Sequence, residues 1–264
     1  MAMVDIEAPL GLRWASTMTQ AQDDAYVCGL VPEETDARFL SQHLAAYAFA
    51  RRFAHQKRVL EIGFGDGYGA SYLAEVARDV TGIDMAPGNI PIAQQKYRRE
   101  NLHFRHMEGT RLDFPDGSFD VVGSFQVIEH LPEPRLADHL TEVRRVLTPG
   151  GIYCLSTLNL EHNMKPGKPY EKLRYHEKEF TGPQLRELLQ QFFPSVELHG
   201  LYLTRRHQVF LRLKRWGLMT LGPARANPIA RFYDRVSVED YRTKPHVSRH
   251  ALDLIAVCRK TPST

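Results

Sequence analysis

Cysteine is scarce in this sequence, and the three cysteines that it contains lie far apart. Cys28, Cys154 and Cys258 form no C-x-x-C pair and no cluster with histidine. Disulfide frameworks and structural zinc sites need cysteines at short, regular intervals, so neither is indicated here. The scarcity is typical of proteins of the reducing cytoplasm, and we expect that location.

Long apolar runs are also absent. No stretch approaches the roughly 20 consecutive apolar residues that a membrane-spanning helix needs, and the amino-terminal segment lacks a basic stretch followed by a continuous apolar one. We therefore expect a soluble, non-secreted protein without a membrane span. With 264 residues, of which 43% are hydrophobic and 25% charged, the chain can form one large globular domain with additions.

Short apolar runs alternate with helical segments from Arg58 onward. The pattern predicts helices at 68–78, 88–100, 136–147 and 182–192, the last capped by Thr181 and Gln184, and strands at 58–62, 80–84, 102–107, 119–124, 151–157, 195–201 and 251–259. Such alternation is typical of βαβ units with right-handed crossovers. We expect an α/β, Rossmann-like fold: a seven-stranded, mostly parallel sheet, its last strand antiparallel, with helices on both faces.

Two segments fall outside this alternation. Residues 1–56 are expected to form a helical N-terminal lid, with a helix over 41–54 that Ser41 caps. Residues 57–264 would form the main domain. Within it, residues 202–250 have no counterpart in a minimal sheet, and they are expected to form an inserted, helical, basic cap.

The 202–250 segment contains many more arginines and lysines than acids. One interpretation is a solvated cap whose apolar residues cover the sheet edge, among them Phe210, Leu213, Trp216 and Leu218. Another is a binding surface for an anionic or sugar-phosphate ligand, since arginine pairs well with phosphate and carboxylate. No nucleic-acid recognition module is present, so nucleic acid is a less favoured ligand.

A glycine-rich turn follows the first expected strand. The stretch RVLEIGFGDGYGA places glycines at 63, 65, 67 and 69 just before a helix. Glycine lets the backbone approach a ligand closely, and a helix N-terminus offers free N–H groups. Asp84 ends the next strand about 20 residues later, where a carboxylate can bind both ribose hydroxyls. The pattern therefore predicts a site for an adenosine-containing cofactor.

The loop alone fits two cofactors. Residues Gly65 to Ala70 also match the G-x-G-x-x-A pattern of dinucleotide sites, and glycines that serve only a tight turn are a third interpretation. Glu61 distinguishes the two cofactors, because a carboxylate two residues before Gly63 would repel a pyrophosphate. The same carboxylate suits the cationic amino-acid and sulfonium groups of S-adenosylmethionine (SAM). Glu61 therefore favours SAM over NAD.

Three further stretches extend the pattern: EGTRLDFPDGSFDVV from Glu108, SFQVIEHLPEP from Ser124 and RRVLTPGGIYCLST from Arg144. With VLEIGFGDGYG and GIDMA they cover residues 58 to 157, and this part of the chain resembles the class I SAM-dependent methyltransferase family. The resemblance is to its methyltransferase type 11-like branch, which acts on small molecules. It implies a transferase that binds SAM and releases S-adenosylhomocysteine.

The resemblance also implies roles for individual residues. Glu108 stands where Asp or Asn is commoner in the family, and Met85 could instead be a core residue. The implied cofactor contacts are Glu61 and Gly63 near the methionine part, Phe64 and Gly65 in the glycine loop, Asp84 on the ribose, Met85 against the adenine face, Glu108 and Gly109 at the adenine edge, and Phe125 beside the methionyl group.

Methyl transfer from a sulfonium is an in-line displacement, so a hydroxyl acceptor must lose its proton and an amine must arrive unprotonated. His130, in the turn after the fourth strand, is the best candidate for the base, because a histidine titrates near neutral pH. Its alternative role is a hydrogen bond to a neighbouring loop. His162 and His176, in the loop after the fifth strand, are further candidates.

Some RNA-terminus methyltransferases of this class bind a divalent ion through Glu-x-x-Glu-His and later histidines. Here Gln126 replaces the first glutamate, so we expect no metal.

The expected function is O- or N-methylation of a small molecule, such as a sugar, lipid-linked or natural-product hydroxyl, with an anionic or sugar-containing acceptor favoured. The alternatives are an RNA methyltransferase, a non-catalytic SAM-binding protein and a nicotinamide-dependent reductase. The sequence indicates no oligomeric state.

Overall fold

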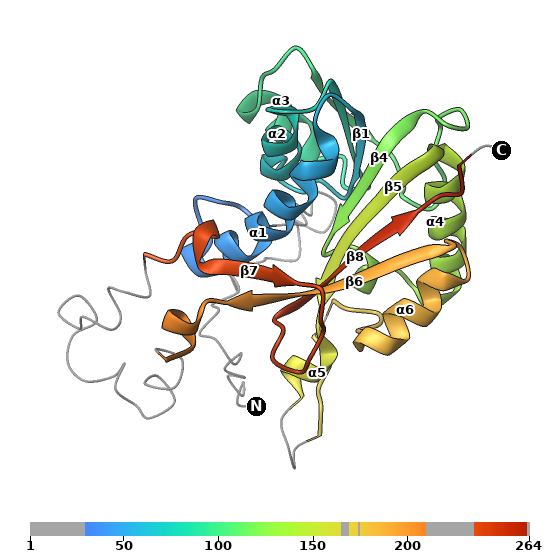
Figure 1. The fold of residues 1–264 in the computed structure, drawn as a ribbon. Helices are drawn as coiled ribbons and strands as arrows, with labels where there is room; N and C mark the ends of the chain where they lie inside the picture. Colours follow the sequence, from blue (N-terminus) through green and yellow to red (C-terminus); the bar gives the residue numbers. More distant parts are fainter. Residues whose placement is uncertain (1–29, 165–168, 174, 210–234, 263–264) are drawn as a thin grey trace, which may run out of the picture.

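A computed structural model describes residues 30–164, 169–173, 175–209 and 235–262. Its centre is one sheet with the strand order β3-β2-β1-β4-β5-β8-β6-β7 (Figure 1). The strands are β1 (Arg58–Ile62), β2 (Asp79–Asp84), β3 (Leu102–His106), β4 (Phe119–Phe125), β5 (Leu147–Leu158), β6 (Ser195–Leu203), β7 (Tyr241–Lys244) and β8 (Asp253–Arg259). Strands β1 to β5 pair in parallel, whereas β8 runs antiparallel to both β5 and β6.

Helices cover both faces of the sheet, as predicted (Figure 1). They are α1 (Ala37–Ala54), α2 (Tyr68–Ala74), α3 (Asn89–Lys96), η2 (Ile128–His130), α4 (Glu133–Val146), α5 (Leu160–Asn163), α6 (Gly182–Gln190) and η4 (Val238–Asp240). Successive strand residues enter different apolar clusters: Val59 packs with α1 and α2, and Leu60 packs with α4 and α6. Strands buried on both faces explain the near-continuous apolar runs in the sequence.

The prediction of seven strands is wrong, because the sheet has eight. The additional strand, β7, lies within the 202–250 segment that we expected to be an inserted cap, and it pairs antiparallel with β6 from Gly200↔Lys244 to Leu203↔Tyr241. Its four residues, YRTK, alternate between a buried Tyr241 and exposed cations. An alternation of only four residues within a basic stretch is too short to predict a strand. The apolar residues of the expected cap, from Phe210 to Leu218, lie outside the described residues.

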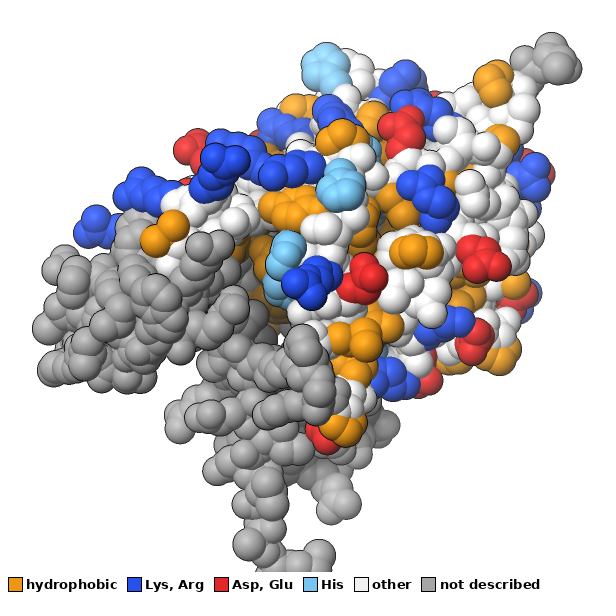
Figure 2. Space-filling view, turned by 60° about the horizontal axis from the view of Figure 1, so that its bottom comes forward, with side chains coloured by type: hydrophobic (Ala, Val, Ile, Leu, Met, Phe, Trp, Pro, Cys, Tyr) orange, Lys and Arg blue, Asp and Glu red, His pale blue; other side chains and the backbone are white. Residues whose placement is uncertain are grey.

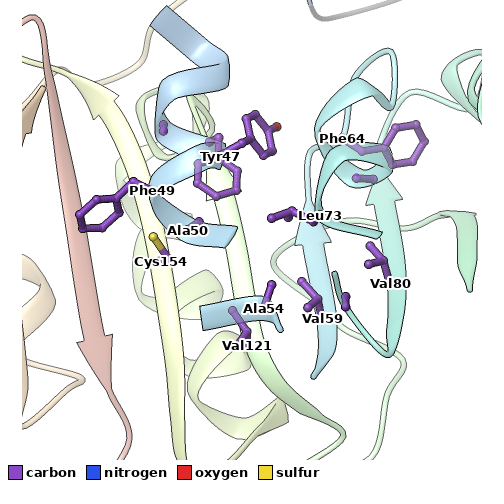
Figure 3. Close-up of a cluster of buried hydrophobic side chains, with 14 of the residues drawn as sticks. Tyr47, Phe49, Ala50, Ala54, Val59, Phe64, Leu73, Val80, Val121 and Cys154 are labelled. Carbon is purple, nitrogen blue, oxygen red and sulfur yellow. The ribbon is translucent and has the colours of Figure 1, made fainter. Parts of the chain in front are cut away.

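Helix α1 is part of the core. Its buried side chains include Tyr47, Phe49 and Ala50, which face the sheet and α2 (Figure 3). The predicted cap is wrong: the helix begins at Ala37, and its N-cap Asp36 accepts a hydrogen bond from a first-turn backbone N–H. Ser41 lies inside the helix. The lid function of residues 1–56 stays a prediction, and residues 1–29 of this segment lie outside the described residues.

The predicted capping box at Thr181 is confirmed, since its hydroxyl accepts from the Gln184 N–H while the Gln184 side chain accepts from the Thr181 N–H. Strand β5 begins earlier than predicted, because Leu147 pairs with Phe119 ahead of the Pro-Gly-Gly turn. Within the described part of the chain, no helix combines the length and the apolar character that crossing a membrane requires.

Candidate functional site

The glycine loop lies at the carboxyl end of β1, where the strand order reverses between β2 and β4. In open α/β sheets ligands bind at such a switch point. Gly63 has a φ of +75°, and a Cβ there would come within 2.6 Å of Val127 Cγ2. Glycine is therefore required at this position by both conformation and space. The Phe64 side chain is 2% exposed and packs on Phe104, so only its backbone can contact a ligand.

The carboxylate of Asp84 ties the glycine loop to the end of β2. Its two oxygens accept hydrogen bonds from the backbone N–H groups of Gly65 and Ala86, each at 2.8 Å. Burial raises the pKa of Asp84, and these hydrogen bonds act in the opposite direction. The neighbouring Met85 is 70% exposed, so the interpretation of Met85 as a core residue is wrong. A fixed carboxylate beside an exposed apolar side chain suits a ribose and an adenine face.

Glu61 lies on β1 and is fully buried. Its Oε1 accepts a hydrogen bond of 2.6 Å from the hydroxyl of Tyr47 on α1, while its buried Oε2 has no hydrogen-bond partner in the described residues. Burial raises the pKa of Glu61 to about 7, the Tyr47 hydrogen bond opposes that change, and the charge of Asp84 adds to it. The carboxyl is thus poised to ionise when a cation approaches.

Tyr47 is a site residue that the sequence analysis did not single out. Its ring lies 4.1 Å, between centroids, from that of Phe125, and a Cβ on Gly69 would come within 2.1 Å of its Cζ. The packing places Phe125 in the core at 6% exposure, against Tyr47 of α1. In the sequence Tyr47 is one apolar position among several on a helix, and only the docking of α1 on β1 shows its partner.

The expected adenine edge lies at the end of β3. The Glu108 carboxylate accepts a hydrogen bond from Arg135 Nη2 at 3.1 Å and is largely exposed. The carbonyl of Gly109 accepts from His139 Nδ1 at 2.8 Å, and a Cβ at Gly109 would come within 2.6 Å of an Ile62 methyl group. The backbone of Gly109 is therefore held close to β1, while the longer Glu108 side chain points to Arg135 on α4.

Two of the three predicted histidines come together, and Glu129 joins them. One ligand atom of Glu129, one of His130 and one of His176 all lie within 4.8 Å of one another. The exposed His130 donates through Nδ1 to the Tyr175 carbonyl at 2.9 Å, so its expected loop hydrogen bond is confirmed. His162 lies on α5 and is not a member of this group.

His176 is nearly buried, and its Nδ1 lies 2.7 Å from Glu179 Oε1. Burial, together with the charges of His130 and Lys172, lowers the pKa of His176 to about 4. The loop that carries His176 is attached to η2, because the N–H groups of Glu177 and Lys178 donate to the Glu129 carbonyl at 2.7 and 3.1 Å.

Glu129 is the second residue that sequence analysis missed as a site residue. It is fully buried, and burial raises its pKa to about 8 against the lowering effect of its hydrogen bonds. Its place between Ile128 and His130 was visible in the sequence, but its burial and its contact with a loop 47 residues later were not.

Residues 60–155 match the family model of the methyltransferase domain. Over these residues the chain matches the methyltransferase family that its sequence motifs resemble. The matched residues run from β1 into β5 and contain the glycine loop, Asp84, Glu108 and the turn with His130.

Among the curated proteins that the chain resembles are two bacterial methyltransferases. A probable S-adenosylmethionine-dependent methyltransferase of Mycolicibacterium smegmatis is 39% identical over 150 residues, which are 56% of each chain. A ubiquinone biosynthesis O-methyltransferase of Roseobacter denitrificans is 38% identical over 104 residues, 39% of this chain and 41% of the relative. The chain thus spans about half the length, or less, of these relatives.

Solved structures support the fold. A SAM-dependent methyltransferase from Thermotoga maritima superposes with a TM-score of 0.59 at 16% identity, over 84% of this chain and 92% of that one. At this identity the likeness concerns the fold of the chain alone.

Proposed function

We propose that this protein transfers the methyl group of SAM to a hydroxyl or amine of a small molecule. The observation that carries the proposal is the pair of buried carboxyls, Glu61 and Asp84, on either side of the glycine loop at the switch point of the sheet. Two acids at this place favour a cationic, adenosine-containing ligand over a pyrophosphate.

Each part of SAM has a matching group in the site. Asp84 would bind the ribose hydroxyls, because a carboxylate has about four lone-pair sites and Asp84 receives two backbone hydrogen bonds and one from the Asn89 side chain. Exposed Met85 would cover the adenine, and Glu108 and the backbone of Gly109 would border it. Glu61, with the backbone of Gly63, Phe64 and Gly65, would face the amino-acid and sulfonium part, and Phe125 would support it from the core.

His130 would accept the proton of the acceptor. Its Nδ1 donates to a backbone carbonyl, so in the neutral ring Nε2 carries the lone pair. SAM, when bound, would supply the methyl group, and His130 Nε2 would take the proton that the acceptor hydroxyl loses as its oxygen gains the methyl group, the C–S bond breaks and S-adenosylhomocysteine is released. His176 and His162 border the same side of the sheet and would contact the acceptor. None of these steps requires a metal.

An anionic or sugar-containing acceptor suits the charges around the end of β6 and β7. Arg205, Arg206, Arg242 and Lys244 are exposed there. Figure 2 shows that lysine and arginine side chains gather on one part of the face that it presents. The O-methyltransferase among the similar proteins supports an oxygen acceptor. The lid function of residues 1–56, the acceptor-side role of 202–250 and the cytoplasmic location remain parts of this proposal.

Calorimetry with SAM, S-adenosylhomocysteine and NAD(H) tests the cofactor. We expect both SAM-type ligands to bind and NAD(H) not to bind; binding of NAD(H) alone would overturn the proposal. Asp84→Ala should weaken SAM binding by roughly 1.5–3 kcal/mol, the value of charge-assisted hydrogen bonds. Asp79→Ala, at the opposite end of β2, is the matched control and should bind SAM like the wild type.

Turnover is tested with radiolabelled SAM and a panel of sugar phosphates, carboxylates and phenols. Label transfer to one of these confirms a small-molecule methyltransferase. Transfer to RNA, with binding that weakens steeply with salt, would instead support the RNA alternative. SAM binding without transfer to any acceptor class would support a non-catalytic role.

A further inference from the structure

Three side chains of metal-binding type meet beyond the carboxyl ends of β4 and β5. Glu129 and His130 belong to η2, and His176 comes from the loop before α6, yet one ligand atom of each lies within 4.8 Å of the other two. The two imidazole rings are perpendicular, with centroids 4.8 Å apart. Backbone hydrogen bonds from Glu177 and Lys178 to the Glu129 carbonyl hold the two segments together. The cluster is therefore built by tertiary structure and does not depend on one exposed loop.

Both histidines are oriented through Nδ1. His130 Nδ1 donates to the Tyr175 carbonyl at 2.9 Å, and His176 Nδ1 lies 2.7 Å from a Glu179 oxygen. Histidines that bind metals almost always donate their other ring N–H to a carbonyl or a carboxylate, which fixes the tautomer and the ring. Nε2 is the ring atom that remains for a ligand in each residue.

Glu129 provides an independent observation. Its side chain is fully buried, and while Oε2 accepts a hydrogen bond of 2.9 Å from Thr157, Oε1 is buried without a hydrogen-bond partner in the described residues. A buried, unsatisfied carboxyl oxygen is costly unless a proton, a water or a cation compensates it. A cation coordinated by the two neighbouring histidines would do so.

We propose that Glu129, His130 and His176 bind one divalent cation. Two imidazoles and one carboxylate suit Zn²⁺, Co²⁺ or Mn²⁺, whereas Mg²⁺ and Ca²⁺ prefer sites made of oxygens only. Three protein ligands leave coordination positions open for water or an acceptor oxygen. The expectation of no metal rested on Gln126 in place of a glutamate, but these three ligands do not include that position; the Gln126 amide donates to Ser156 Oγ at 3.3 Å.

The cation would change the chemistry of the acceptor, and this part rests on the proposed function. A hydroxyl bound to the metal loses its proton more readily, as metal-bound water does. His130 would then be a ligand of the cation rather than the proton acceptor. The acceptor class that this favours is a hydroxyl compound with a second oxygen or an anionic group close by, able to occupy the open positions.

The test is metal binding to the full-length, metal-free protein, measured by calorimetry with Zn²⁺ and by the visible absorption of bound Co²⁺. We expect one ion per chain. The ligand variants His130→Gln and His176→Gln should each weaken binding at least tenfold. Glu179→Gln, which replaces the carboxylate partner of His176 by a neutral amide, should weaken it about 10–100-fold. His103→Gln, an exposed histidine at the sheet edge, is the matched control and should leave binding unchanged.

Absence of one-to-one binding of Zn²⁺, Co²⁺ and Mn²⁺ to the wild type would overturn the proposal. Unchanged metal binding by His130→Gln would overturn it as well. Because His130 is exposed, the variant should fold normally, and circular dichroism checks this. SAM affinity is measured on the same samples. If the wild type does not bind SAM, the proposed function is contradicted. If it binds SAM but no metal ion, only this inference is contradicted.

Discussion

Binding of SAM should release a proton from Glu61. The buried carboxyl has a pKa of about 7 in the absence of a ligand, chiefly because of burial. A sulfonium or ammonium group beside it stabilises the ionised form, so SAM binds that form preferentially and lowers the pKa. Affinity then rises with pH. With a pKa near 7, about one tenth of the carboxyls are ionised at pH 6 and about nine tenths at pH 8, which corresponds to a roughly tenfold difference in affinity, or about 1.4 kcal/mol.

The assay is calorimetry at pH 6, 7 and 8 in two buffers with different ionisation enthalpies, which reports both affinity and proton release. We expect release of about half a proton per SAM at pH 7. Glu61→Gln should bind more weakly at pH 8, show no proton release from this site and lose most of the pH dependence. Glu75→Gln, an exposed glutamate after α2, is the control. Equal wild-type affinity at pH 6 and 8, without proton release, would refute this reasoning.

Three further results are expected. Gly69→Ala should destabilise the fold by about 1–3 kcal/mol in urea unfolding, because its Cβ would come within 2.1 Å of the Tyr47 ring; an unchanged midpoint would mean that α1 packs elsewhere. Met85→Ala should change stability by less than about 0.5 kcal/mol, since the side chain is 70% exposed, but weaken SAM binding; unchanged affinity would remove Met85 from the adenine face. Burial raises the pKa of Asp253 from 3.8 to about 7, so the folded state binds the Asp253 proton more tightly than the unfolded state does. Stability should therefore fall as pH rises through this window, and Asp253→Asn should flatten the fall in Tm between pH 5 and 8.

The sequence was most informative where a property is local. Alternating apolar runs located strands β1 to β6 and β8, and glycines followed by a helix located the turn after β1, because strand burial and turn conformation depend on neighbouring residues. The place of Asp84 at the end of the second strand was also predicted. The ends of elements were less accurate, since Asp36 and not Ser41 caps α1.

Contacts between distant segments could not be predicted in the same way. The hydrogen bond from Tyr47 to Glu61 joins a helix to a strand, and the pKa of Glu61 follows from a burial that no local pattern encodes. His130 and His176 were candidates by residue type. Their proximity to each other and to Glu129 depends on how the loop after β5 folds back, which the sequence did not reveal. Strand β7 escaped prediction because four residues are too few for a period to emerge.

The short strand β7 has a consequence for protein engineering. A sheet edge exposes unpaired N–H and C=O groups to which another chain can add, and exposed cations on the edge oppose such addition. In the described residues Arg242 and Lys244 are exposed on the β7 edge, and His103 and Arg105 on the β3 edge. Replacing the β7 cations to alter acceptor charge preference would therefore also make self-association easier, so any such variant needs its aggregation state measured before its kinetics are compared.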